Sequence, residues 1–102
     1  MNLKIDTTLV SMKYSKQFSK GLKKAIKQGK DINKISYVLE KLANKEVLET
    51  KYRNHKLVND KFYKDCYECH IEPDWLLIYK YIDDELVLLL INTGSHSEVF
   101  WL

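Results

Sequence analysis

Hydrophobic and polar positions follow a helical period in the first half of the chain. Apolar residues recur at three- and four-residue spacing over residues 15–28 and 31–44, with lysines on the other faces, as in helices that bury one side. Ser15 and Asp31 are typical N-cap residues, and Gly29 is a typical helix stop. We expect two amphipathic helices, with buried faces formed by Phe18, Leu22, Ala25 and Ile26 and by Ile32, Ile35, Val38, Leu39 and Leu42.

A period of two dominates the remaining segments. Residues 7–14 alternate loosely and predict a short first strand, and a further short strand is expected near residues 56–58. Residues 66–71 alternate clearly, and the apolar runs at 75–82 and 85–91 predict a hairpin joined at Asp83 and Asp84. Residues 93–95 are typical of a second turn, before a short C-terminal element at 96–102.

This order predicts an α+β fold in one domain, residues 1–102. An N-terminal strand and a two-helix hairpin pack on an antiparallel sheet whose other face is partly open, and His70 lies on that open face. No apolar run is long enough to span a bilayer, and the first residues lack the layout of a secretory signal. We therefore expect a cytoplasmic protein that does not contact the membrane.

Charge is distributed unevenly, although the net charge is only +3. Residues 1–30 carry eight lysines and one acid, whereas residues 65–102 carry eight acids and one lysine. A basic front half suits binding to phosphates or to an acidic partner, but solvated helix faces explain it equally well. The chain holds sixteen lysines and a single arginine, which leaves few bidentate phosphate clamps.

The two cysteines belong to a C-x-x-C-H segment, Cys66 to His70. This spacing occurs at haem attachment sites, but strand alternation places the two thiols on opposite faces, unlike a haem or redox motif on a helical turn. A zinc site lacks a second cysteine pair. We expect two free thiols, one packed and one partly exposed, and no metal or other cofactor.

Candidate chemistry comes from His55, His70 and His96 together with Asp74. Histidine titrates near neutral pH, so these groups suit a metal-free acid–base site, although single histidines are more often surface or core residues. Trp75 and Phe100 are expected beside the open face. Stacking on an RNA base is one interpretation of Trp75, and a core or rim anchor is the favoured alternative.

Two segments resemble a known family. Residues 68–79 (ECHIEPDWLLIY) and 92–100 (NTGSHSEVF), together with the basic helices and residues 54–57, are similar to the YafQ branch of the RelE-type toxins of bacterial toxin–antitoxin systems. The resemblance spans nearly the whole chain. It implies a RelE-like, microbial-RNase-type fold and a ribosome-dependent endoribonuclease that cleaves mRNA in the A site without a metal, leaving a 2′,3′-cyclic phosphate.

The resemblance also implies partners and residue roles. The partners are a cognate antitoxin, the ribosome and mRNA, with operator DNA reached only through the antitoxin. His96 and Asp74 take the main proton-transfer roles, and His55 and His70 share proton transfer or phosphate contacts. Trp75, Phe100, Asn92 and Lys56 are the implied substrate-binding residues.

Two positions depart from the family's pattern. Asn92 and Tyr67 stand where relatives commonly carry arginines that stabilise phosphate charge, and losing one such donor typically costs about 10²–10³ in rate. Lys51, Arg53, Lys56 and Lys64 are the residues that can compensate. The alternative function is a non-enzymatic toxin that inhibits a target protein, as ParE-like relatives do, or a catalytically weak, antitoxin-binding member of the same fold.

Overall fold

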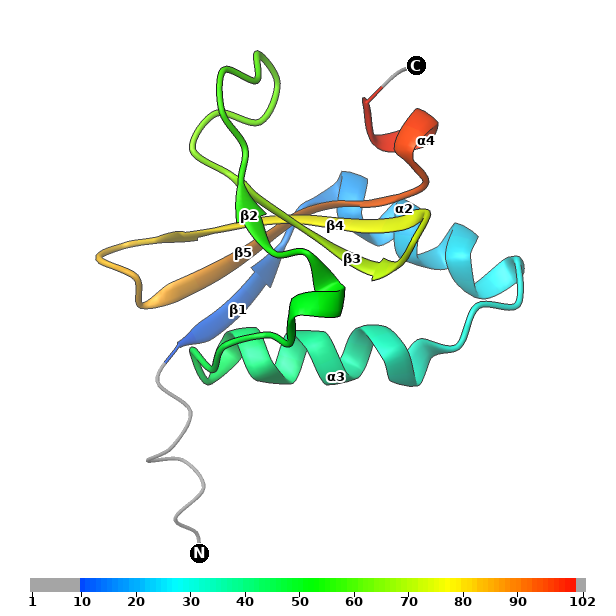
Figure 1. The fold of residues 1–102 in the computed structure, drawn as a ribbon, viewed down its shortest axis with the longest axis horizontal. Coiled ribbons are helices and arrows are strands. Elements are labelled where there is room, and N and C mark those ends of the chain that lie inside the picture. The colour runs from blue at the N-terminus through cyan, green and yellow to red at the C-terminus, as the bar shows by residue number, and fades with distance from the viewer. Residues whose placement is uncertain (1–9, 101–102) are drawn as a thin grey trace, which may run out of the picture.

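A five-stranded sheet with two helices on one face forms the molecule (Figure 1). The structure, a computed structural model, describes residues 10–100. The elements follow the expected order: β1 (Ser11–Tyr14), α2 (Lys16–Lys27), α3 (Ile32–Ala43), the 3-10 helix η1 (Thr50–Tyr52), β2 (His55–Lys56), β3 (Tyr67–Glu72), β4 (Trp75–Ile82), β5 (Val87–Gly94) and α4 (His96–Phe100). The predicted α+β fold is confirmed. No helix among the described residues is long and apolar enough to cross a membrane.

The sheet is mixed, whereas an antiparallel sheet was expected. Its order is β1-β5-β4-β3-β2, and all neighbours are antiparallel except β1 and β5. The two helices return the chain so that β1 lies parallel to β5, and this long-range pairing leaves no local mark in the sequence. Residues 7–9 of the predicted first strand lie outside the described residues, and Thr93 and Gly94 end β5 where a turn was predicted.

Both helices begin where the sequence predicts. The Ser15 hydroxyl accepts from the Phe18 backbone N–H at 3.0 Å, and the Asp31 carboxylate accepts from that of Asn33 at 2.9 Å. Helix α2 lies very close to β5, because a Cβ on Gly21 would stand 2.1 Å from the Thr93 carbonyl oxygen. Glycine is therefore required at this crossing, and the close contact fixes α2 against the strand that leads to His96.

The main core lies between the helices and the sheet. Phe18, Ala25, Ile35, Val38 and Leu42 pack there against Cys69, Ile71, Trp75, Leu77 and Tyr79. Ile26 and Ile32, expected in the buried faces, are 50% and 44% exposed. These two positions lie at the edges of the helical stripes, where the apolar pattern is wider than the surface that the sheet covers.

A smaller core covers part of the other sheet face. Cys66, Leu76, Ile78 and Val99 are buried there, and Tyr63 and Phe100 pack against them. The predicted alternation of Cys66 and Cys69 is confirmed, but both thiols are buried. The expectation of one partly exposed thiol is wrong, because α4 and the segment between β2 and β3 cover the face that was expected to be open there.

Candidate active site

Strand order brings His96 and Asp74 together although they are 22 residues apart. Asp74 lies in the tight turn between β3 and β4, and His96 begins α4 directly after β5. Strands β4 and β5 are antiparallel with Leu76 opposite Gly94, so the start of one strand meets the end of the other. The Asp74 carboxylate accepts from the His96 ring nitrogen Nδ1 at 2.7 Å and from its backbone N–H at 2.8 Å.

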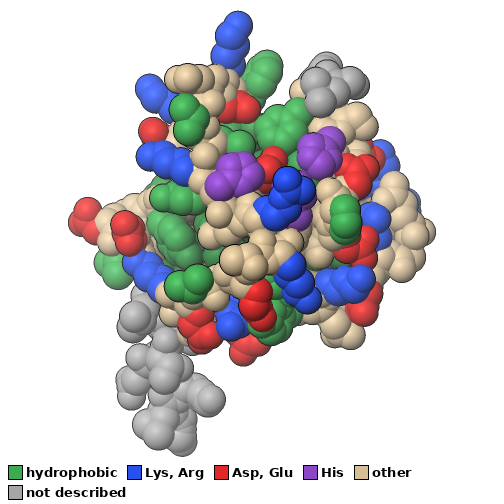
Figure 2. Space-filling view, viewed as in Figure 1, with side chains coloured by type: hydrophobic (Ala, Val, Ile, Leu, Met, Phe, Trp, Pro, Cys, Tyr) green, Lys and Arg blue, Asp and Glu red, His purple; other side chains and the backbone are tan. Residues whose placement is uncertain are grey.

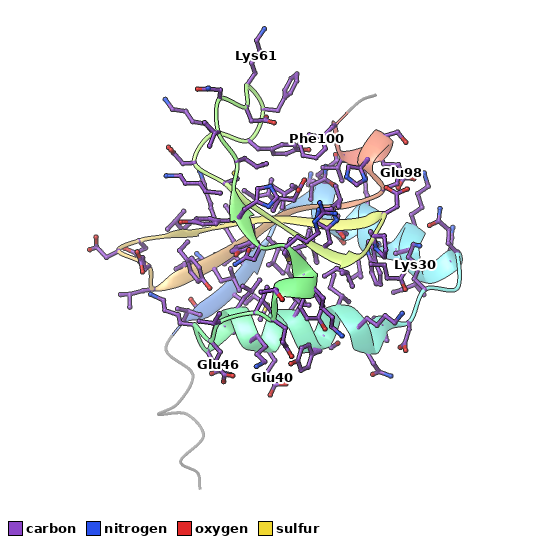
Figure 3. The ribbon with its side chains drawn as sticks, in the orientation of Figure 1. Lys30, Glu40, Glu46, Lys61, Glu98 and Phe100 are labelled. Carbon is purple, nitrogen blue, oxygen red and sulfur yellow. The ribbon has the colours of Figure 1, made fainter. Side chains whose placement is uncertain are left out.

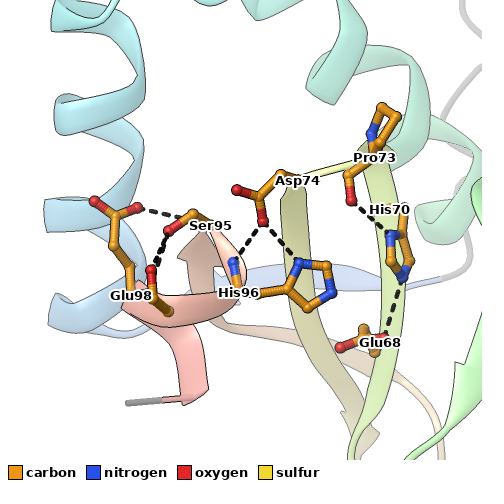
Figure 4. A network of polar contacts seen from close by, with 8 residues as sticks. Glu68, His70, Pro73, Asp74, Ser95, His96 and Glu98 are labelled. Carbon is orange, nitrogen blue, oxygen red and sulfur yellow. Dashed lines mark hydrogen bonds and ion pairs between the residues drawn. The ribbon is translucent and has the colours of Figure 1, made fainter. Parts of the chain in front are cut away.

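This contact keeps Asp74 ionised and orients the His96 ring (Figure 4). The backbone N–H of His96, followed by its ring N–H, lowers the pKa of Asp74 below its ordinary value, so the carboxylate stays ionised. A proton on Nδ1 leaves the other ring nitrogen, Nε2, free to accept or donate a proton. The His96 side chain is 47% exposed, so this nitrogen is accessible to a substrate.

Helix α4 is shaped by the TGSHSE segment. The Ser95 hydroxyl accepts from the Glu98 N–H at 3.2 Å, and the Glu98 carboxylate accepts from the Ser95 N–H at 2.9 Å, which is a capping box. Gly94 suits this position because its φ of 158° is one that residues with a side chain rarely adopt, and a Cβ there would also crowd Glu98. Glu98 also pairs with Lys24 of α2, and this lysine, followed by the Ser95 N–H, lowers the pKa of Glu98.

A second polar group surrounds Glu68. His70 follows two residues later on the same face of β3, and β2 pairs with β3 so that His55 stands opposite Glu68. The Nε2 atoms of His55 and His70 each lie 3.3 Å from the same Glu68 oxygen. The other ring nitrogens face carbonyl oxygens, that of Arg53 at 2.7 Å from His55 and that of Pro73 at 3.2 Å from His70.

The two groups form one continuous site. The His70 and His96 rings are 5.5 Å apart between centroids, and the space-filling view shows histidine side chains on one face with basic side chains beside them (Figure 2). The structure therefore brings His55, His70, Asp74 and His96 together. It adds Glu68, which is only 6% exposed and which sequence reasoning left unassigned. Its position two residues before His70 was the available signal.

The expected substrate-binding residues differ in their positions. Lys56 is exposed on β2. Phe100 is half-buried in α4 (Figure 3). Its ring contacts the Tyr63 ring edge-on, with 5.6 Å between the ring centroids. Trp75 is 1% exposed, and its indole N–H donates to the Thr93 hydroxyl at 3.0 Å, so it is a core anchor and its ring cannot stack on a base.

Asn92 is also buried, at 6% exposure. Its side-chain N–H donates to the Tyr63 hydroxyl at 2.9 Å, and its carbonyl oxygen accepts from the Thr93 N–H at 2.8 Å. The Tyr63 hydroxyl in turn donates to the Val99 carbonyl at 2.7 Å. Asn92 therefore ties the β2–β3 segment to α4 and is not placed to bind substrate, because both ends of its amide are already bonded inside the protein.

Comparison with known proteins shows which family the chain belongs to. A family model described as the bacterial toxin of type II toxin–antitoxin system, YafQ, matches residues 10–101. This chain belongs to the YafQ toxin family. The mRNA interferase toxin YafQ of Escherichia coli strain B / BL21-DE3 is 42% identical over 91 residues, which cover 87% of this chain and 94% of that protein.

Solved structures show that the YafQ fold is shared. A metal-bound toxin from Helicobacter pylori superposes with a TM-score of 0.81 at 40% identity, covering 89% of this chain and 99% of that one. YafQ in the E. coli DinJ–YafQ toxin–antitoxin complex gives 0.79 at 38% identity, covering 90% and 98%. Among residues 10–100 of this YafQ-family chain, no three His, Cys, Asp or Glu side chains are arranged to hold a metal ion.

Proposed function

We propose that this toxin is an mRNA endoribonuclease that cleaves ribosome-bound message in the A site by acid–base chemistry without a metal. The observation that carries the proposal is the His96–Asp74 pair, joined at 2.7 Å on an accessible face. It lies beside the group formed by Glu68, His55 and His70, which we call the Glu68 cluster. Relatives named mRNA interferase toxins support it. The same chemistry predicts a 2′,3′-cyclic phosphate and a free 5′-hydroxyl.

The reaction needs two proton transfers. The 2′-oxygen forms a bond to phosphorus as its proton leaves, and the bond from phosphorus to the 5′-oxygen breaks as that oxygen gains a proton. His96 Nε2 handles one of these protons, while Asp74 orients the ring and balances the charge of its protonated form. Asp74 is thus a positioning residue, since its lowered pKa makes it a poor proton donor.

The Glu68 cluster handles the other proton. Both ring nitrogens of His70 and of His55 lie within hydrogen-bond reach of oxygen atoms, so both rings are held in a defined orientation. Glu68 offers one carboxylate oxygen to the two rings. The cluster therefore holds two imidazoles beside His96, within reach of the same substrate.

A cognate antitoxin is the expected protein partner, as in the DinJ–YafQ complexes that this fold matches. We propose that the antitoxin neutralises the toxin in the cytoplasm and that operator DNA is contacted through the antitoxin. The ribosome contributes substrate positioning, with the basic helices binding ribosomal RNA.

Replacing His96 tests the proposed function. We expect His96→Gln to reduce mRNA cleavage by about 10²–10⁴-fold, the usual contribution of a positioned acid or base, and to abolish growth arrest. Primer extension on cellular mRNA after brief induction measures cleavage, and co-expression of the adjacent antitoxin gene should suppress it. Lys61→Ala, on the distant β2–β3 segment (Figure 3), is the matched control.

Two outcomes contradict the proposal. Full cleavage by folded His96→Gln protein removes the proposed role of the histidine pair. Growth arrest by the wild-type protein without any cleaved mRNA supports the alternative function, in which the toxin acts by binding alone.

A further inference from the structure

A hollow of about 430 Å³ opens beside His70, on the side away from His96. It lies between η1 and the end of β3, before the two-residue strand β2 begins at His55. Strand β2 pairs only with Tyr67 and Glu68, so β3 beyond Glu68 has no partner strand on this edge among residues 10–100. The hollow is in the size range of small-molecule sites and shares a wall with the candidate active site.

The interior of the hollow is largely apolar. Tyr52, Ile71 and Pro73 line it. The Tyr52 ring is held by Tyr37, at 6.0 Å between centroids, and by the Lys51 ammonium group, 5.2 Å from the ring centre. Tyr52 therefore lines the hollow as a half-buried aromatic ring, the kind of side chain on which any nucleobase can stack.

The rim of the hollow is basic. Lys34, Lys51 and Arg53 line it together with His70. Lys34 is bound to Glu72 at 2.9 Å, but Lys51 and Arg53 form no ion pair with any described residue. The rim therefore keeps uncompensated positive charge next to the histidines, which suits a phosphate group.

Arg53 is held at this rim by an unusual backbone. Its φ and ψ of 50° and 42° are left-handed, a conformation that disfavours residues other than glycine. The His55 ring nitrogen Nδ1 lies 2.7 Å from the Arg53 carbonyl oxygen, so the only arginine of the chain is coupled directly to a catalytic histidine. Arg53 also lines the hollow, so its guanidinium group is available at this rim to bind a phosphate.

We propose that this hollow is a ribonucleotide subsite: it holds the nucleoside next to the cleaved phosphate, with the base on Tyr52 and a phosphate oxygen on Arg53. This inference rests on the proposed function and extends it. Arg53 then supplies the charge stabilisation that Asn92 and Tyr67 do not, since Asn92 is bonded inside the fold and Tyr67 stacks on Tyr79.

Binding is tested on the full chain by NMR, with 5′-AMP, 5′-UMP and inorganic phosphate as separate probes. The nucleotides should shift the signals of Tyr52, Arg53 and His70, and phosphate alone should shift only those of Arg53 and Lys51. Tyr52→Ala should weaken nucleotide binding by about fivefold or more, the usual loss of one stacking contact, while Tyr52→Phe should retain it.

Arg53→Gly separates binding from folding. Glycine favours the left-handed backbone, so the variant should unfold at the same temperature as the wild type or higher, yet bind nucleotides and phosphate much more weakly. Arg53→Lys should recover part of the binding, and Lys61→Ala should match the wild type.

Cleavage assays distinguish this inference from the proposed function. Arg53→Gly should lower the cleavage rate about 10²-fold, and Tyr52→Ala should raise KM more than it lowers kcat, because the stacking that it removes helps to bind the substrate. If the wild type cleaves and both variants cut the same sites at the same rate, the subsite proposal is refuted, whereas the proposed nuclease function is retained. If nucleotides leave Tyr52 unshifted while an antitoxin peptide shifts it, the hollow is a protein-binding site and the inference is overturned. If the wild type binds nucleotides but never cleaves, the proposed function is what fails.

Discussion

The two acidic residues of the site, Asp74 and Glu68, have different surroundings that the sequence alone does not distinguish. Asp74 is largely exposed, yet two donors from His96 lower its pKa, so it acts by holding a ring in place. Glu68 is buried and lies between two imidazoles. The exposed acid therefore orients its partner, and the buried acid is enclosed between two imidazoles.

The two thiols give a prediction at this scale. Burial raises the pKa of Cys69 to about 12 and also raises that of Cys66, so neither forms thiolate near neutral pH, and the thiolate is the reactive form. We expect the folded protein to react with Ellman's reagent at pH 8 only at the rate of unfolding, and to release two equivalents in denaturant. Rapid reaction of one thiol in the native state contradicts the burial.

The sequence predicted some of these residues well and others not at all. His70 was placed on the correct face because alternation is a local property, and His96 and Asp74 were assigned from the motif. The position of Glu68 between two histidines was missed because it depends on the pairing of β2 with β3, which brings His55 opposite Glu68. Trp75 was ambiguous because a large aromatic residue at a strand start suits a core and a stacking surface equally.

Among the elements, α4 depends most on its surroundings. Five residues are too few for a stable isolated helix. The helix is held by Asp74 on the His96 N–H, by the Ser95–Glu98 capping box and by the ion pair of Glu98 with Lys24. Its position, and with it that of His96, therefore rests on two carboxylates.

This dependence predicts that acid releases α4 first. Asp74 and Glu98 both have lowered pKa values in the folded protein. Their contribution is therefore complete above the ordinary values of about 3.9 and 4.3 and is lost as the pH falls through the lowered ones. Amide signals of residues 95–100 should change below about pH 4, before those of β4. Glu98→Gln should weaken α4 docking already at pH 7, and simultaneous loss of α4 and β4 in the wild type contradicts the prediction.

The starts of the two helices were predicted more accurately than the end of β5, and the difference has a physical reason. Ser15 and Asp31 mark helix starts through their own side chains, so the helices were located closely. The end of β5 was placed too early because Thr93 and Gly94 have turn-like chemistry, whereas pairing with Leu77 and Leu76 keeps them extended.

In the whole molecule, the uneven charge is partly neutralised internally. Lysines of the helical half reach acids of the sheet half: Lys30 and Lys34 pair with Glu72, Lys24 with Glu98, and Lys45 with Glu85. The basic surface available to RNA is therefore smaller than the lysine count indicates. Lys51 and Lys56 pair with no acid among the described residues and lie near the histidines.

Salt dependence of ribosome binding measures this difference. Each phosphate contact contributes roughly 0.7–0.9 to the slope of log affinity against log salt. We expect Lys51→Ala combined with Lys56→Ala to reduce the slope by about 1–2. Lys41→Ala, which removes a lysine paired with Glu46 at 3.5 Å, should leave the slope unchanged. Equal slopes for the double variant and the wild type contradict this assignment.

The pairing of β1 with β5 makes the sheet depend on segments from opposite ends of the described chain. The Ser15 hydroxyl donates to the Ile91 carbonyl across 76 residues, and His96 follows β5, so neither the complete sheet nor the His96–Asp74 contact forms without these residues. A partly made chain carries His55 and His70 but has no His96 to complete the pair with Asp74. A fragment that stops before β5 therefore lacks both the β1–β5 pairing and the His96–Asp74 contact.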